Sequence, residues 1–205
     1  MIQYPSGSKP RLLKVKSPLK DKQKTQSTVN YGSRGMSLED KVNQTNTYYL
    51  THQLAVIHKK PTPIQVVKVD YPKRSAAKIV EAYYKNASTT DYNGVYQGYY
   101  IDFEAKQTNN KTAFPLANLP IHQREHMMAC IEQGGIAFLL LAFVRLDETY
   151  LVPYERIHQY INKAEKQSIP YSVIKESGYL CKSGVFPLLD YLAALDTYLE
   201  QRDDS

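Results

Sequence analysis

The stretch Thr89–Thr108, TTDYNGVYQGYYIDFEAKQT, decides the predicted fold, because it combines strand-forming aromatics with an unusual cluster of charges. Asn93–Gly94 is a dipeptide that favours tight turns between paired strands, so we expect the chain to fold back there or at Gly98. Successive side chains of a strand point to opposite faces. One face of the second strand should therefore enter the core and the other should carry the charges. The expected core face is Tyr99, Ile101, Phe103 and Ala105, and the opposite face is Tyr100, Asp102, Glu104 and Lys106.

The charged face predicts chemistry at a phosphodiester. Glu104 and Lys106 are neighbours on that face, and Asp91 reaches the same region from the paired strand. Two converging carboxylates repel each other and favour a cation between them, and oxygen ligands select Mg²⁺ or Mn²⁺. An adjacent ammonium can stabilise the negative charge of a transition state. The set suits metal-assisted hydrolysis of a phosphodiester.

Other readings of this face stay open. A strand face with a solvated Glu–Lys pair is common and weakly stabilising. Asp102 shares the face with Glu104 and is a rival metal ligand of lower rank. Glu39, in the first turn of an upstream helix, could also enter the site, although helix capping is the favoured explanation.

The flanking elements predict an α/β domain. Ser37 can cap a helix whose apolar residues recur at helical spacing and which should end before Pro61. A β-branched strand over Ile64–Val69 and a short helix over Ala76–Tyr84 follow. This order favours a mixed central sheet flanked by helices. Downstream we expect a helix from 118–120 to 132, strands over 136–144 and 149–154, and helices over 155–166 and 187–200.

Positive charge is concentrated at the N-terminus. Residues 1–35 hold eight Lys or Arg against one acid, whereas the other residues hold 18 basic and 19 acidic groups, so the net charge of +6 comes from this segment. It is also rich in Ser, Pro, Gln and Gly, so we expect a flexible basic arm over 1–35. The charged face of the hairpin makes the remainder, 36–205, the expected nuclease domain. Basic arms are suited to polyphosphates, although a solubilising tail is the alternative.

A second basic region is expected to project as a stalk over about 70–85. Lysines and one arginine alternate there with tyrosines, a composition that fits a surface meeting phosphates and stacking on bases. A solvated helix with half-buried tyrosines is an equally good local reading. The candidate DNA-binding residues are Arg34 in the arm and Lys73, Arg74, Lys78 and Lys85 in or beside the stalk.

Other features narrow the class of protein. No apolar run is long enough for a membrane span, and the N-terminus lacks the apolar segment of a signal peptide, so we expect a cytoplasmic protein. Cys130 and Cys181 lie far apart in the sequence and are read as reduced, packed thiols. His122 and His126 could chelate zinc as an i, i+4 pair, but no third soft ligand accompanies them.

The motif carries a family resemblance. Asp91, followed after twelve residues by Glu104-Ala105-Lys106, resembles the PD-(D/E)xK core of restriction-endonuclease-like nucleases, with Thr90 in place of the usual proline. The wider text resembles the RecU family of Holliday-junction resolvases over nearly the whole chain. The segments that carry this likeness are NYGSRGMSLEDKVNQTNTYYL (30–50), STTDYNGVYQGYYIDFEAKQT (88–108) and AFPLANLPIHQREHM (113–127).

The resemblance implies a restriction-endonuclease-like mixed sheet and a role for each site residue. Asp91 and Glu104 match metal-binding carboxylates, Thr89 and Gln123 match positions that complete a magnesium site, and Lys106 matches the catalytic lysine. Spacing alone would have chosen neither Thr89 nor Gln123.

The resemblance also implies a biological setting. It implies a stalk that enters the centre of a four-way junction, a homodimer that nicks two opposed strands, and a link to a RecA-type recombinase. The setting would be recombination, DNA repair and chromosome segregation near the nucleoid. A non-catalytic junction-binding protein that modulates a recombinase, and a nuclease for ordinary duplexes or flaps, are the other hypotheses.

Overall fold

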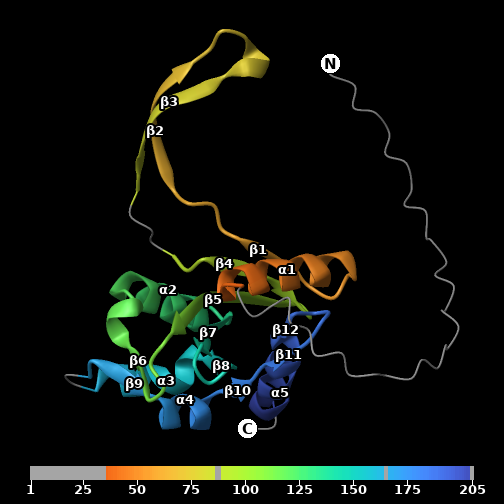
Figure 1. Ribbon diagram of the computed structural model, residues 1–205, viewed down its shortest axis with the longest axis vertical. Helices are drawn as coiled ribbons and strands as arrows, with labels where there is room; N and C mark the ends of the chain where they lie inside the picture. Colours follow the sequence, from red (N-terminus) through yellow and green to blue (C-terminus); the bar gives the residue numbers. More distant parts are fainter. Residues whose placement is uncertain (1–35, 86–88, 164–165, 204–205) are drawn as a thin grey trace, which may run out of the picture. The chain divides into compact units, whose positions relative to one another are not determined.

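The computed structural model describes residues 36–85, 89–163 and 166–203 (Figure 1). The predicted arm over 1–35, including Arg34, lies outside the described residues. Among the described residues, no helix is long and apolar enough to cross a membrane.

A six-stranded mixed sheet forms the centre of the fold, as predicted. Its strand order is β1-β4-β5-β7-β8-β10. The β5–β7 pair is parallel, whereas its neighbours β4–β5 and β7–β8 are antiparallel. β5 therefore lies inside the sheet, with both edges hydrogen-bonded. The strands are β1 (Val56–Lys59), β4 (Tyr92–Tyr96), β5 (Tyr99–Thr108), β7 (Ile136–Phe143), β8 (Glu148–Pro153) and β10 (Tyr179–Leu180).

The β4–β5 hairpin turns at Gln97–Gly98 and not at Asn93–Gly94. Gln97 and Gly98 both have positive φ, 49° and 84°, and Tyr96 pairs with Tyr99 across the turn. Gly94 instead lies within β4, where it pairs with both β1 and β5. The turn expected at Asn93–Gly94 was wrong, because Gly94 serves close packing against β1, and the alternative fold-back at Gly98 is confirmed.

Helices cover the sheet on both faces and divide the core in two (Figure 1). One core cluster contains side chains of α1, α5 and the Ile101/Phe103 face of β5, and the other contains side chains of α2, α3 and α4. β7 contributes to both clusters and is buried along its whole length, as expected for its continuous apolar run. The helices are α1 (Leu38–Thr51), α2 (Ile121–Glu132), α3 (Tyr154–Asn162), α4 (Tyr171–Ser177) and α5 (Tyr191–Asp203).

The region predicted as a stalk is a β-ribbon. β2 (Ile64–Asp70) pairs with β3 (Lys78–Tyr84) in an antiparallel two-stranded sheet with bulges near Lys68. The predicted helix over Ala76–Tyr84 was wrong, because β-branched and aromatic residues at 79–84 find a partner strand. A 3₁₀ turn, η2 (Arg74–Ala76), connects the two strands.

The remaining differences concern the ends of elements and a few short elements that were not predicted. Ser37 caps α1 as predicted, but the helix stops at Thr51 and the chain then forms β1. The last helix begins at Tyr191, after a short strand, and α4 was not predicted. The minor elements are β6 (Ala113–Pro115) paired with β9 (Ser168–Pro170), β11 (Lys182–Ser183) paired with β12 (Leu189–Asp190), and η3 (Leu116–Asn118).

Candidate active site

The structure brings Asp91, Glu104 and Lys106 together. Glu104 lies in the middle of β5, and its side chain is fully buried. The backbone N–H of Asp91, one residue before β4, donates to Glu104 Oε2 at 2.9 Å. Lys106 Nζ lies 2.8 Å from Glu104 Oε1. The strand alternation predicted from the sequence therefore places an acid, a second acid and a lysine at one spot.

The effect of burial on Glu104 outweighs the effect of its positively charged neighbour Lys106. Burial raises the pKa of Glu104 to about 7, and the nearby Asp91 adds to the rise, while Lys106 opposes it. A carboxyl group in this position is stabilised by a proton or by a cation. The site therefore favours binding of a positively charged ligand beside Glu104.

Two buried oxygens fit a hard metal ion. Gln123 Oε1 is shielded from solvent and has no hydrogen-bond partner within the described part of the chain, and Glu104 Oε1 is equally shielded, with the Lys106 ammonium as its ion-pair partner. Buried polar atoms without partners are rare in native proteins and call for a ligand. Oxygen donors of this kind suit Mg²⁺ or Mn²⁺. The donor set is therefore chemically consistent with the predicted metal.

Thr89 and Gln123, the other two expected metal ligands, have weaker structural support than the carboxylates. Thr89 is half-buried, and its hydroxyl donates to the Thr90 carbonyl at 3.2 Å, which leaves the hydroxyl oxygen available as a ligand. Gln123 is buried in the first turn of α2. No hydrogen bond among the described residues joins either side chain to Asp91 or Glu104, so their roles as ligands stay predictions.

Asp102 is occupied by other partners. Its buried carboxylate accepts hydrogen bonds from Lys60 at 2.7 Å, from Tyr100 at 2.8 Å and from the Thr90 hydroxyl. Burial by itself would raise the pKa of Asp102, but these hydrogen bonds outweigh it and lower the pKa. Asp102, the rival metal ligand expected from the sequence, therefore has its carboxylate occupied by partners within the protein.

His126 faces this anion and does not pair with His122. Its Nε2 lies 3.2 Å from Asp102 Oδ2 and 3.6 Å from Cys130 Sγ. Asp102, His126 and Cys130 form a second group whose donor atoms could hold a metal. The Lys60 ammonium already neutralises Asp102 there, so a dication would meet a like charge. This group fits a metal less well than Glu104 does.

Glu39 lies at the rim of the site. Asp40, not Glu39, shares the cap hydrogen bonds with Ser37, while Glu39 forms an ion pair with Lys59. Glu39 and Lys106 line the same cavity of about 410 Å³. The hydrogen bond that Lys59 donates to Glu39 raises the pKa of Lys59, and the charges of Glu39, Asp91 and Glu104 contribute to that rise. Glu39 therefore borders the cavity that Lys106 lines, and its role in the site stays a prediction.

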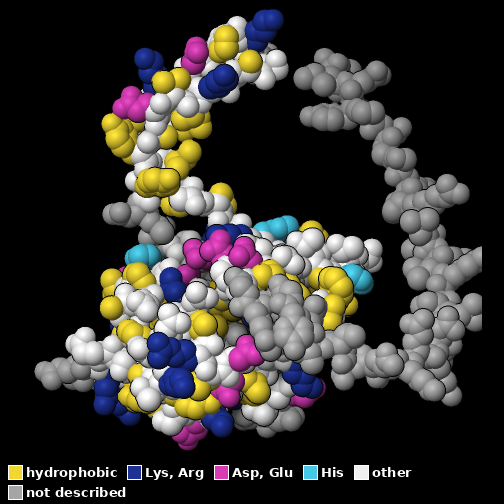
Figure 2. All heavy atoms as spheres, viewed as in Figure 1, with side chains coloured by type: hydrophobic (Ala, Val, Ile, Leu, Met, Phe, Trp, Pro, Cys, Tyr) yellow, Lys and Arg dark blue, Asp and Glu magenta, His cyan; other side chains and the backbone are white. Residues whose placement is uncertain are grey.

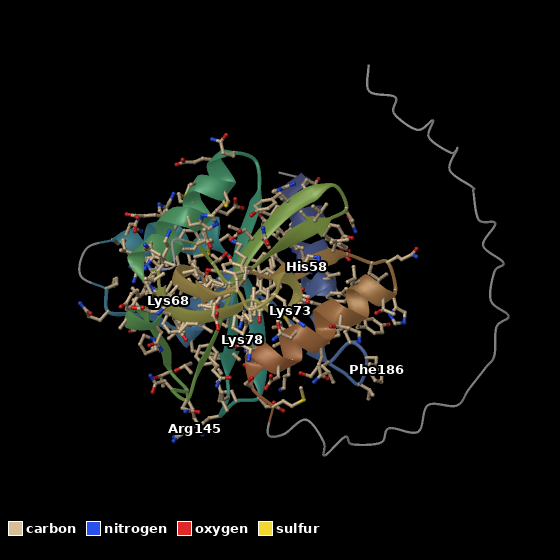
Figure 3. The ribbon with its side chains drawn as sticks, turned by 90° about the horizontal axis from the view of Figure 1, so that it is seen from above. His58, Lys68, Lys73, Lys78, Arg145 and Phe186 are labelled. Carbon is tan, nitrogen blue, oxygen red and sulfur yellow. The ribbon has the colours of Figure 1, made fainter. Side chains whose placement is uncertain are left out.

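The ribbon β2–β3 presents cations and aromatic rings to solvent. Tyr71, Tyr83 and Tyr84 are 69%, 61% and 84% exposed. Figure 2 shows hydrophobic and basic side chains side by side on this ribbon, and Figure 3 labels three of its lysines. Nothing is described of the Arg74 side chain. The exposed basic residues on and beside the ribbon are Lys68, Lys73, Lys78 and Lys85.

Comparison with known proteins decides the family. The family model described as Recombination protein U matches residues 33–197. The chain belongs to the RecU family. A protein of Leuconostoc citreum named Holliday junction resolvase RecU is 52% identical over 97% of this chain and 98% of its own length. Proteins of the same name from Pediococcus pentosaceus and Lactobacillus acidophilus are 50% and 47% identical over 97% and 98% of this chain, and over 98% and 99% of their own lengths.

The comparisons confirm the RecU resemblance and the expectation of an enzyme, since the RecU relatives carry the name of one. A solved structure, Archaeoglobus fulgidus Hjc, is described as a Holliday junction resolvase from an archaeal hyperthermophile. It aligns with a TM-score of 0.41 and 12% identity, over 69% of this chain and 91% of its own.

Sequence reasoning missed the contact between Lys60 and Thr90. Lys60 is thirty residues before Thr90 and reaches it only because β1 pairs with β4. The sequence reasoning placed β1 inside a helix, so nothing pointed to this contact. The one available indication was Thr90 itself, which stands where the nuclease motif usually has proline.

Proposed function

We propose that this chain is an Mg²⁺-dependent endonuclease that resolves four-way DNA junctions by paired nicks in opposed strands. The observation that carries the proposal is the buried carboxylate of Glu104 between Asp91 and Lys106. Membership in the RecU family supports the junction as substrate, because the relatives are named Holliday junction resolvases.

In this proposal Asp91 and Glu104 hold the metal, and Thr89 and Gln123 complete its ligands. Bound Mg²⁺ or Mn²⁺ supplies a Lewis acid for a phosphate oxygen. Lys106 is held beside Glu104 by their ion pair, and it is partly exposed, so its ammonium can approach a phosphate from the solvent side. Its charge would stabilise the charge that develops as the phosphodiester is attacked.

Selectivity for a branched substrate would come from shape and phosphate position. The ribbon β2–β3 supports this, because it joins exposed tyrosines, which can stack on unpaired bases, to lysines, which can contact phosphates. The proposed phosphate contacts are Arg34, Lys73, Arg74, Lys78 and Lys85. A homodimer would match the two-fold symmetry of a junction and supply two equivalent sites.

The proposed cellular role is recombination, DNA repair and chromosome segregation in the cytoplasm near the nucleoid. A RecA-type recombinase is the proposed partner. These statements come from the family resemblance.

Cleavage of a synthetic four-way junction with and without Mg²⁺ tests the proposal. Asp91→Ala and Glu104→Ala should each abolish nicking, while junction binding in a gel-shift assay persists. Glu176→Ala, at an exposed acid on α4, is the matched control and should cleave normally. Full cleavage by both site variants would refute the assigned site.

The same experiment decides between the proposed enzyme and the alternatives. A purified protein that binds junctions but never cuts them with Mg²⁺ or Mn²⁺ would be a non-catalytic binder, and the ribbon alone could support that role. Equal cleavage of junction, duplex and flap at one salt concentration would indicate a general nuclease.

A further inference from the structure

We propose that Lys60 and Asp102 form a buried clamp on Thr90 that positions Asp91, replacing the proline that usually precedes the aspartate of this nuclease motif. The inference rests on the proposed function in one respect, the role of Asp91 as metal ligand. Lys60 and Asp102 are then positioning residues that do not touch the metal or the DNA.

The clamp holds the Thr90 side chain from two sides. Lys60 Nζ lies 2.7 Å from Asp102 Oδ2 and 3.1 Å from the Thr90 hydroxyl oxygen. The same hydroxyl donates to the other carboxylate oxygen of Asp102. Thr90 is 2% exposed and Asp102 is 0% exposed, so these contacts are shielded from water. Shielded, charge-assisted hydrogen bonds are among the strongest in proteins.

The backbone of Asp91 is held at both of its polar groups. Its carbonyl accepts from the Lys60 N–H at 2.7 Å, and its N–H donates to Glu104 at 2.9 Å. Lys60 therefore fixes the segment twice, through its backbone at Asp91 and through its ammonium at Thr90. The side chain of Asp91 is left out of these contacts and can serve a ligand.

This arrangement can do the work of a proline. Proline restricts the backbone before folding and so lowers the cost of ordering a segment. Threonine lacks that restriction, and here tertiary hydrogen bonds from two strands supply it. No hydrogen bond from the Thr90 N–H is found among the described residues, so a proline ring at this position would displace none.

The partners of Asp102 argue against a role as metal ligand. Oδ2 contacts Lys60, Tyr100 and His126, and Oδ1 contacts Thr90. The lone pairs of a carboxylate number about four, so this carboxylate has none to spare. Lys60 similarly directs its ammonium into the protein, with its side chain 19% exposed, and not toward a phosphate.

The test removes both charges together, so that no buried charge is left unpaired. The double variant Lys60→Met/Asp102→Asn should bind Mn²⁺ about tenfold more weakly by calorimetry, with faster hydrogen exchange at the Asp91 amide. At saturating metal it should retain cleavage within about threefold of the wild type. Adding Thr90→Pro should recover most of the lost Mn²⁺ affinity.

Three further variants guard the interpretation. Lys60→Arg keeps the positive charge and should bind Mn²⁺ as the wild type does. Thr90→Val removes one hydroxyl with little change of shape. It therefore reports on the clamp if the double variant fails to fold. Lys182→Met, at an exposed lysine, is the control for loss of charge.

The proposal is overturned if the double variant and Thr90→Val both bind Mn²⁺ and protect the Asp91 amide as the wild type does. It is also overturned if the double variant keeps the wild-type affinity for Mn²⁺ and only its rate of junction cleavage at saturating metal falls. Lys60 would then act on the substrate. A wild-type protein that binds no Mn²⁺ would refute the proposed function instead, and the Asp91 amide would still decide whether the clamp exists.

Discussion

At the scale of single residues, Glu104 shows how a fold can prepare a charged ligand. Its backbone belongs to an interior strand, and its neighbours Ile101 and Phe103 fix the register by packing in the core. A one-residue slip would exchange the charged and apolar faces of the strand. The carboxyl group is therefore held in a buried place where it is stable when protonated or bound to a cation.

The raised pKa of Glu104 makes stability depend on pH. The folded pKa, about 7, lies above the unfolded value, so the folded state binds the proton more tightly. This contribution is fully present below about pH 4.5 and is lost as pH rises through 7, at a cost of about 3 kcal/mol by the usual conversion. Urea unfolding in EDTA should show the loss between pH 5 and 8.

Two controls isolate this effect. Glu104→Gln should flatten the pH dependence over the same range, and saturating Mn²⁺ should restore the stability of the wild type at pH 8. A wild-type protein equally stable at pH 5 and pH 8 in EDTA would contradict the assignment to Glu104.

The site could be predicted in part from these residues. Alternation along one strand places Glu104 and Lys106 together, and the structure confirms their contact and the approach of Asp91. Lys60 could not be found, because its contact with Thr90 depends on a pairing between strands far apart in the sequence. Short-range patterns carry no information about such pairings.

At the scale of elements, Gly94 marks the tightest approach between strands of the sheet. A Cβ at this position would lie 2.1 Å from the backbone oxygen of Val56 on β1. Backbone atoms cannot move aside as a flexible side chain can. The site depends on this approach, because β1 delivers Lys60 to Asp91.

Gly94→Ala should therefore destabilise the protein by about 4 kcal/mol or prevent folding, a loss typical of severe overpacking. Gly98→Ala is the matched control, since Gly98 has positive φ but open space around it. It should cost only about 1–2 kcal/mol. Thermal unfolding measures the loss of stability in both variants. Equal losses in Gly94→Ala and Gly98→Ala would contradict the packing argument.

The ribbon allows a test at the same scale. Replacing Tyr71, Tyr83 and Tyr84 by Ser should leave Mn²⁺ binding unchanged, because none of these residues belongs to the site. Junction affinity should fall about tenfold or more, as expected from the loss of base stacking at about 1–3 kcal/mol each. Competition between junction and duplex would reveal the loss of selectivity. Unchanged preference for the junction would exclude the tyrosines from its recognition.

Some strands and helices were predicted correctly from the sequence and others were not, for a physical reason. β7 was identified correctly from its apolar run, because burial on both faces leaves a clear pattern, and α2 was identified from the proline and glycines that bound it. β1 and β3 were taken for helices. Each is short and is stabilised by its partner strand more than by its own sequence, so tertiary pairing overrides local preference.

At the scale of the whole molecule, charge is divided between segments. Residues 1–35 carry a net charge of +7, eight basic groups less one acid, and the rest of the chain carries −1, from 18 basic and 19 acidic groups. Long-range attraction to DNA is therefore expected to depend on the N-terminal segment. The ribbon adds local cations within a nearly neutral remainder.

Removing residues 1–35 should weaken junction binding at low salt and reduce the slope of log affinity against log salt by several units, because fewer counterions are released. The rate of cleavage at saturating junction should change little. Fluorescence anisotropy at 50 to 200 mM salt would measure the slope. An unchanged slope would assign the phosphate contacts to the rest of the chain.

The β4–β5 hairpin also has a consequence for how the chain tolerates changes in length. Tyr92 pairs with Phe103 and Tyr96 with Tyr99, so the next position beyond the paired rows places Asp91 opposite Glu104. The number of residues between Asp91 and Glu104 in the sequence is therefore set by the length of the hairpin. Residues inserted at the exposed Gln97–Gly98 tip leave the two acids facing each other. A single residue inserted within either strand would separate them, so we expect this hairpin to accept added residues at its tip and not within its strands.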